Sequence, residues 1–152
     1  MRRFRWSLQR LLDVTLRRED AQKAQVQAIA GRIAAVYREI EAAEAMKAGI
    51  LTALSRQGLM RRMAIHDVAV NSIARYEAEK RNLQETVEVL QREKQQAAEK
   101  LLEIRMYRQM LEKLRGKAHD EYLRQVRLED QKLQDESAVM GFARSLADGR
   151  TG

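Results

Sequence analysis

The sequence of 152 residues contains no proline and no cysteine, and aromatic residues make up only 5% of it. Without proline, no position is barred from the interior of a helix. Without cysteine, disulfides and thiol chemistry are excluded, which fits a reducing cytoplasm. No stretch is apolar enough to span a membrane, and arginines interrupt the apolar residues at the N-terminus. We expect a cytoplasmic protein with no direct membrane insertion.

A long three-four repeat of apolar residues runs from Ile73 to Tyr122. Eleven of its fifteen positions are apolar, against 45% for the whole chain, which indicates a helix with a narrow coiled-coil seam. A second seam of the same period runs from Leu8 to Leu54. We expect ten residues of the two seams to form the coiled-coil core: Val26, Ile29, Ile33, Val36, Ile40, Leu83, Val87, Leu90, Leu101 and Ile104.

The repeat is lost after Leu54, where Ser55 to Gly58 give a turn signal. Two helices joined by a short turn fold back antiparallel, so the fold class is all-α. We predict one elongated coiled-coil hairpin over residues 1–152, with a helix at 4–55, a turn at about 55–62, a longer helix at about 62–140 and a loose tail at 141–152. The second helix extends beyond the first.

In an antiparallel helix pair, residue numbers rise along one helix where they fall along the other, so the numbers of any two facing seam residues add up to the same value. For this sequence the value is 116 or 123. The sum of 123 places Lys94 against Ile29, so we predict 116, which sets Gln22 against Lys94. Lys80 then lies opposite Val36 with no hydrogen-bonding partner, and its side chain extends outward.

The formal net charge is +7, with basic and acidic residues interspersed along the helices. This favours a solvated surface over a nucleic-acid-binding stripe, while an acidic protein partner stays compatible with it. The open end of the hairpin has more apolar surface than one seam needs. Either the C-terminal segment or a second chain covers it, or it docks another protein.

Residues with chemical function are nearly absent. No phosphate-binding glycine loop occurs, and the two histidines, His66 and His119, are too far apart along one helix to share a metal ion. We predict a protein that is not an enzyme and has no cofactor, no metal and no catalytic residue, and that acts by contact.

The whole sequence, including its length and the position of its turn, resembles the flagellar export protein FliJ family, most clearly at its two ends. The first part of the resemblance is an aromatic and Leu/Val opening followed by basic and acidic residues: Phe4, Trp6, Leu8, Leu11, Leu12, Val14, Leu16, Arg17 and Glu19. The second is a Leu-rich, Tyr-containing and acidic C-terminal part: Leu111, Glu112, Lys113, Leu114, Tyr122, Glu129, Gln131, Asp135 and Glu136.

The resemblance implies a stalk-like coiled coil in the type III export apparatus, which serves flagellum biogenesis and motility. Its implied partners are the hexameric export ATPase, the cytoplasmic domain of the membrane export gate, and export chaperones, at a position peripheral to the inner membrane. For the ATPase ring we predict contacts by Leu11, Leu12, Leu16, Arg17, Arg18, Met106, Met110 and Leu114. For the gate, position alone suggests Tyr37, Glu41 and Tyr76.

Two other interpretations stay open at this point. A homodimeric structural scaffold would pair the same seams between two chains, and a basic nucleic-acid-binding rod would bind with a steep dependence on salt. The turn signal at Gly58 argues against the first, and the dispersed charge against the second.

Overall fold

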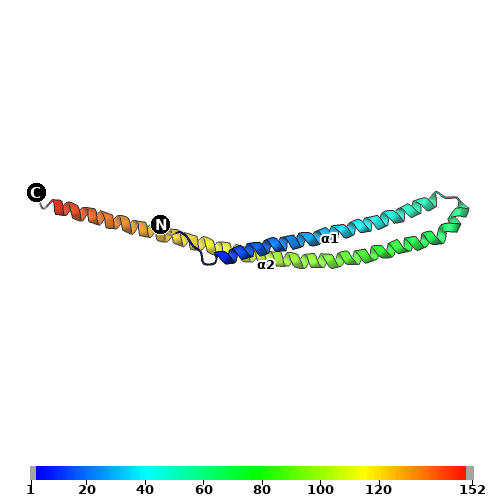
Figure 1. Cartoon of the computed structure of the whole chain (residues 1–152), viewed down its shortest axis with the longest axis horizontal. Coiled ribbons are helices and arrows are strands. Elements are labelled where there is room, and N and C mark those ends of the chain that lie inside the picture. Colours follow the sequence, from blue (N-terminus) through cyan, green and yellow to red (C-terminus); the bar gives the residue numbers. More distant parts are fainter. Residues whose placement is uncertain (1–2, 150–152) are drawn as a thin grey trace. The chain divides into compact units, whose positions relative to one another are not determined.

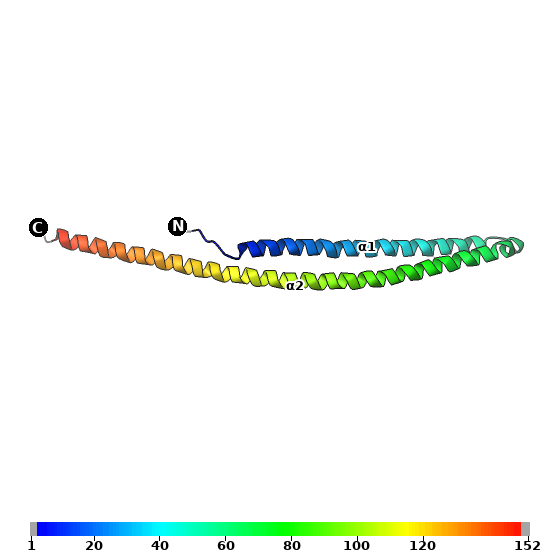
Figure 2. The ribbon, with the colours of Figure 1, turned by 60° about the horizontal axis from the view of Figure 1, so that its bottom comes forward.

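The structure, a computed structural model, describes residues 3–149, which form two helices, α1 (Gln9–Ser55) and α2 (Leu59–Asp148). The two helices pack against each other as an antiparallel hairpin (Figures 1 and 2), so the predicted all-α hairpin is confirmed. α2 has 90 residues and α1 has 47, so the second helix is much the longer, as predicted.

The chain divides into two compact units, which differs from the prediction of one domain over 1–152. Unit 1 combines residues 1–16 with residues 105–152, of which 3–16 and 105–149 are described. Unit 2 is the hairpin proper, residues 17–104, with the bend between its two helical parts.

The core of unit 2 is the predicted seam. Ile29, Ile40, Val87, Leu90 and Leu101 are buried, and the other five predicted core residues are half-buried, so all ten lie where the pattern placed them. Ala43, Ala69 and Ala97 are also buried and let the helices approach closely. A two-helix pair has only one such layer, which explains why most other side chains stay exposed.

The register differs from the prediction. Four side-chain contacts join the helices of unit 2, between Lys47 and Glu77, Glu44 and Lys80, Arg32 and Glu93, and Tyr37 and Gln91. Their residue numbers add up to 124 to 128, close to the rejected sum of 123 and far from 116. A fifth contact, from the Gln22 side chain to the Ala97 backbone carbonyl, gives 119, between the two sums.

The argument against the sum of 123 was the burial of Lys94, but Lys94 is exposed, because a lysine stem can leave a seam and carry its ammonium group into water. Gln22 does not face Lys94 but donates a hydrogen bond from Nε2 to the Ala97 carbonyl (2.9 Å). Lys80, for which no partner was expected, pairs with Glu44.

The start of α1 also differs from the prediction. Residues 3–6 are extended and a turn at Ser7 and Leu8 leads into the helix, which begins at Gln9 and not at residue 4. The Gln9 amide donates to the Trp6 carbonyl (3.2 Å) at this turn. In this extended conformation Phe4 packs on α2 against His119 and Tyr122.

The predicted loose tail at 141–152 is wrong for its first part, because α2 continues through Gly141 to Asp148. One glycine costs a helix only about 1 kcal/mol relative to alanine, and the residues around Gly141 are mostly good helix formers. The helix ends where the Gly149 amide donates to the Ser145 carbonyl (3.1 Å). Residues 150–152 of the predicted tail lie outside the described residues. The predicted turn at about 55–62 is shorter in the structure, with Arg56, Gln57 and Gly58 between the helices.

Candidate functional site

Residues 3–149 contain no group of three or more histidine, aspartate or glutamate side chains that could hold a metal ion. Over the same residues, neither helix has a segment long and apolar enough to cross a membrane. The features that stand out are two surfaces on which apolar and basic side chains occur together, one in each unit.

The N-terminal segment alternates in exposure along its length. Arg3 and Arg5 are exposed, whereas Phe4 and Trp6 are half-buried, as expected for an extended chain in which successive side chains point to opposite sides. The Phe4 ring meets the His119 ring edge to face (5.1 Å between centroids) and lies 5.5 Å from the ring of Tyr122. The two aromatic residues therefore attach the segment to α2 and leave the arginines in solvent.

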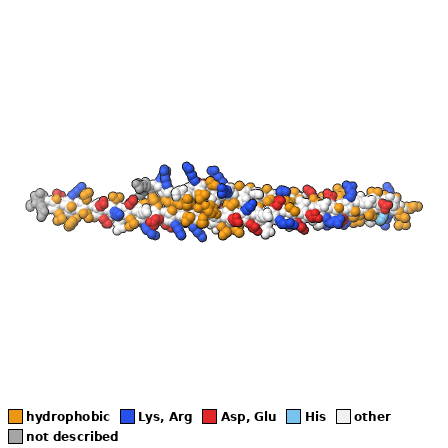
Figure 3. All heavy atoms as spheres, turned by 90° about the horizontal axis from the view of Figure 1, so that it is seen from below, with side chains coloured by type: hydrophobic (Ala, Val, Ile, Leu, Met, Phe, Trp, Pro, Cys, Tyr) orange, Lys and Arg blue, Asp and Glu red, His pale blue; other side chains and the backbone are white. Residues whose placement is uncertain are grey.

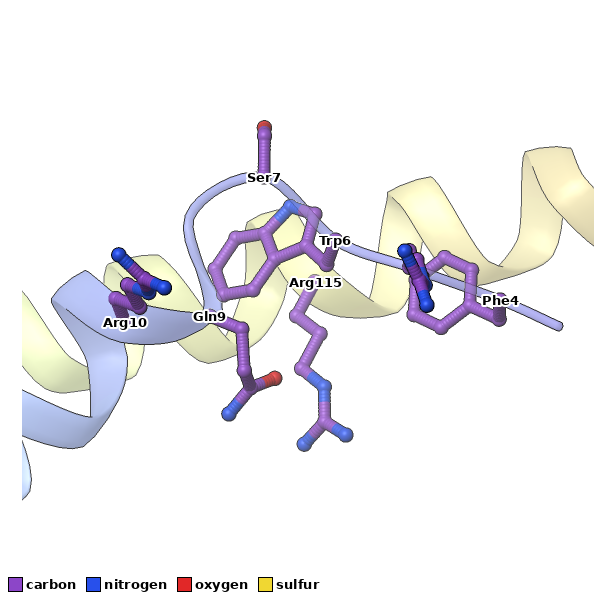
Figure 4. A pocket seen from close by; sticks show the side chains of 7 residues that line it. Phe4, Trp6, Ser7, Gln9, Arg10 and Arg115 are labelled. Carbon is purple, nitrogen blue, oxygen red and sulfur yellow. The ribbon is translucent and has the colours of Figure 1, made fainter.

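Trp6 lies beside a shallow hollow at the start of α1. Figure 4 shows its indole on the turn into α1, with Gln9 and Arg10 from α1 and Arg115 from α2 around it. Beneath this turn Leu12 and Leu111 are both buried, Leu111 with only 1% of its surface exposed. Unit 1 therefore has a buried seam of its own, and Thr15 adds a buried hydroxyl that donates to the Leu11 carbonyl (2.7 Å).

Apolar side chains outside this seam gather on unit 1. Figure 3 shows them where the N-terminal segment lies on α2, with Lys and Arg side chains along both borders. In an antiparallel pair, positions rotated in the same sense from the seam lie on one face. By this geometry the exposed residues Leu11, Val14, Met110 and Leu114 share a face.

The fold concentrates positive charge at this place. Residues 3–16 and 105–117 together carry eight basic and two acidic side chains, a net charge of +6 out of +7 for the chain. The two stretches are far apart in sequence, so the excess of basic residues is dispersed along the sequence and is brought together only where α1 and its N-terminal segment lie against α2. The prediction of a dispersed charge is corrected by this finding.

The residues predicted to contact an ATPase ring divide into four groups. Leu11, Met110 and Leu114 share the face just described, and Met106 is exposed on the side of α2 away from the seam. Leu16 is exposed on the opposite face. Leu12 is buried in the seam, because it lies one turn from Leu8 on the inner side of α1, and it is removed from the set. Arg17 and Arg18 are exposed but belong to unit 2.

A second surface, which sequence reasoning missed, lies at the bend of unit 2. Leu59, Met60 and Met63 are 76%, 88% and 75% exposed, and we call these three residues the bend surface. In a register near 123 the last residue of α1, Ser55, lies opposite residue 68, so the first turns of α2 have no partner helix. The signal was in the sequence, since residues 45–66 contain six leucines and methionines and no acidic residue. Arg62 closes the bend by donating to the Ser55 carbonyl.

The three residues predicted for a gate do not form one site. Tyr37 and Glu41 are exposed one turn apart on α1, and the Tyr37 hydroxyl lies 3.5 Å from Gln91 Nε2. Tyr76 is half-buried beside Glu77, whose partner is Lys47. Lys47 lies ten residues beyond Tyr37, roughly 15 Å along α1. The shift of register is the reason for this separation.

Ion pairs along the borders of the seam help to hold the register. The hydrogen bond from Lys47 lowers the pKa of the Glu77 carboxyl, and the hydrogen bond to Glu44 raises the pKa of the Lys80 ammonium group. Glu19 is buried in the seam, and its carboxylate lies 3.3 Å from Lys23 Nζ. The pairs of Lys47 with Glu77 and of Glu44 with Lys80 join the two helices, whereas that of Glu19 with Lys23 lies within α1. None of them forms a cleft in which a substrate could bind.

No family model, curated protein or solved structure matches this chain. The resemblance to the flagellar export protein FliJ family therefore stays a prediction.

Proposed function

We propose that this protein is a non-catalytic coiled-coil component of a type III export apparatus of the flagellar kind, where it binds the export ATPase ring and couples it to the membrane export gate and to export chaperones. The observation that carries the proposal is the presence of two separate apolar and basic surfaces, one in each unit, joined through one continuous helix, α2. A protein that links two partners needs two such surfaces and no catalytic group.

The ring contacts belong to unit 1. We assign them to the exposed residues Leu11, Leu16, Met106, Met110 and Leu114. Methionine adapts its shape to a partner, which suits a ring that changes conformation during ATP hydrolysis. The basic side chains of residues 3–16 and 105–117 would favour an acidic ring surface and speed the encounter.

The gate contact is assigned to the bend surface in place of Tyr37, Glu41 and Tyr76. Leu59, Met60 and Met63 are the more exposed residues and are contiguous on the first turns of α2. Unit 2 has a packed seam, which resists bending because a bend would open buried contacts such as those of Leu90. Under this proposal the protein works in the cytoplasm, peripheral to the inner membrane.

The proposal is tested with purified export ATPase and with the secretion of flagellar subunits by cells. Met110→Asp should reduce ATPase binding at least about tenfold, because it places a carboxylate within an apolar contact. Met60→Asp should retain ATPase binding and lose subunit secretion. Val89→Asp is the matched control, since Val89 is about as exposed as Met110 and lies on neither surface. Equal ATPase binding by all three variants would exclude the assigned ring contact.

The positive charge concentrated in unit 1 makes nucleic-acid binding the second candidate function. Eight basic side chains near Phe4 and Trp6 could contact phosphates and stack on bases. This function predicts that binding to a DNA or RNA strand falls steeply as salt is raised. Two results together would favour nucleic-acid binding over the export function. The double variant Arg5→Glu and Arg10→Glu would lose binding to the nucleic acid, and the unmodified chain would not bind the ATPase.

A further inference from the structure

The bend surface lies at the end of unit 2, where α2 begins. Figures 1 and 2 show the first turns of α2 curving toward the end of α1, so these turns form the end of the unit. Leu59, Met60 and Met63 lie within about 100° of one another around the helix axis. They are the three most exposed large apolar side chains in residues 3–149. Exposed apolar patches of this kind are common sites of contact with a partner.

Positive charge accompanies these apolar side chains. Residues 45–66 carry four basic side chains and no acidic one. Lys47 is paired with Glu77 on α2, which neutralises its charge. The other three are exposed and form no ion pair within the described residues 3–149: Arg56, Arg61 and Arg62. The bend therefore carries three positive charges that no acidic side chain of the chain pairs with.

The contacts of the bend keep this charge at the end of the unit. Arg62 donates a hydrogen bond to the Ser55 carbonyl, which holds its guanidinium group across the bend. The first acidic residue of α2 is Asp67, roughly 12 Å along the helix from Leu59. The first two turns of α2 therefore carry only positive charge, and they fit an anionic partner.

The composition of the bend narrows the choice of anionic partner. Residues 45–66 contain no aromatic side chain, so the bases of a nucleic acid would find no ring on which to stack. An acidic protein would need an apolar pocket shaped to accept a protruding end made of Leu and Met side chains. An anionic membrane needs no matching pocket, because its interface takes up apolar side chains while its phosphates attract the basic ones.

We propose that the end of unit 2 binds the surface of a membrane that contains anionic phospholipid. Leu59, Met60 and Met63 enter the headgroup region, and the three arginines of the bend contact lipid phosphates. A guanidinium group suits this role because it donates two parallel hydrogen bonds to one phosphate. Neither helix of the described residues is apolar enough to cross a membrane, and this contact does not require one.

The contact is reversible and depends on salt. Each basic side chain near an anionic lipid surface strengthens binding about fivefold, and salt weakens this attraction. The apolar side chains add a contribution that salt does not screen. The inference does not rest on the export function. If the chain also works at a membrane gate, the same end of unit 2 meets the gate and the lipid beside it.

Dye fluorescence locates the contact, because the chain has no cysteine of its own and a single introduced cysteine can be labelled. Met60→Cys with an environment-sensitive dye should shift its emission to the blue with vesicles of phosphatidylglycerol and phosphatidylcholine, and not with phosphatidylcholine alone. Val89→Cys is the control, since Val89 is 50% exposed in the same unit and lies away from the bend. Its dye should respond to neither kind of vesicle.

Co-sedimentation with the same anionic vesicles tests the charges. Arg61→Glu should weaken binding at least about tenfold, because it removes one attraction and adds a repulsion. The matched control is Arg81→Glu, which makes the same change at an exposed residue roughly 30 Å further along α2 and should bind as the unmodified chain does. Circular dichroism checks that both variants are folded. Lipid is the only partner present, so the result stands whether or not the chain binds an export ATPase or a gate.

Four results would overturn the inference. An unchanged emission of the dye at residue 60 with anionic vesicles would exclude the contact. Equal weakening in Arg61→Glu and Arg81→Glu would show a general effect of net charge. Loss of vesicle binding in the Arg5→Glu and Arg10→Glu double variant, with normal binding by Arg61→Glu, would place the lipid contact on unit 1. A dye at residue 60 that responds to polyglutamate or to a DNA duplex, and not to vesicles, would show a different occupant.

Discussion

Leu90 gives the sharpest test of the seam in unit 2, because it is 3% exposed in a helix pair with only one buried layer. Replacing a buried leucine with alanine costs about 2 to 5 kcal/mol, from lost burial and from the cavity left behind. A two-helix seam is open to water on both sides and can relax, which places the cost at the lower end. Alanine also returns a few tenths of a kcal/mol as the better helix former. We therefore expect Leu90→Ala to reduce the free energy of unfolding by about 2 kcal/mol.

The matched control is Leu102→Ala, which makes the same chemical change at a residue that is 58% exposed. It should change the free energy of unfolding by less than about 0.5 kcal/mol. Urea titration followed by circular dichroism measures both, at one protein concentration, because self-association would shift the midpoint. Equal losses in the two variants would show that Leu90 is not in the interface and would refute the seam.

Three further predictions concern other parts of the chain. Phe4→Ala should detach the N-terminal segment from Tyr122 and increase amide exchange at Trp6, with a loss of stability below about 2 kcal/mol because the residue is only half-buried. Gly141→Ala, at a helical position with open space around it, should raise helix content and stability by up to about 1 kcal/mol. The hydrogen bond from Lys47 lowers the pKa of Glu77, so this pair stabilises the hairpin above the ordinary value of 4.5 and the stabilisation is lost as the pH falls through the lower folded value. Urea midpoints of Glu77→Gln should therefore fall less on acidification than those of the unmodified chain.

The sequence was sufficient for the elements and the seam of this fold. Apolar periodicity placed both helices, Ser55 to Gly58 marked the bend, and all ten predicted core residues are buried or half-buried. It was not sufficient for the register, because a seven-residue repeat presents the same face after a shift of seven residues. The choice then rested on Lys94 alone, and a lysine can occupy either register by extending its stem outward.

The surfaces were harder to predict than the seam, and for two different physical reasons. The extended N-terminal segment had a local signal, because arginine and aromatic residues alternate from Arg3 to Trp6. We nevertheless predicted a helix from residue 4, because the helical pattern that follows was extended back over this segment. The charge of unit 1 had no local signal at all, because its two parts are separated by almost ninety residues. Only the packing of α1 on α2 brings them together.

Buried and exposed residues of α2 explain why one helix can serve two kinds of contact. The seam is matched by α1 and is filled within the chain, so substitutions there act on folding. Leu111 and Leu114 lie three residues apart on α2, the first in the seam with 1% exposure and the second outside it with 41%. We expect Leu111→Asp to unfold unit 1, and Leu114→Asp to leave its helicity intact and to reduce only binding to the ATPase. Loss of helicity in both variants, measured by circular dichroism, would contradict this division between folding and binding positions.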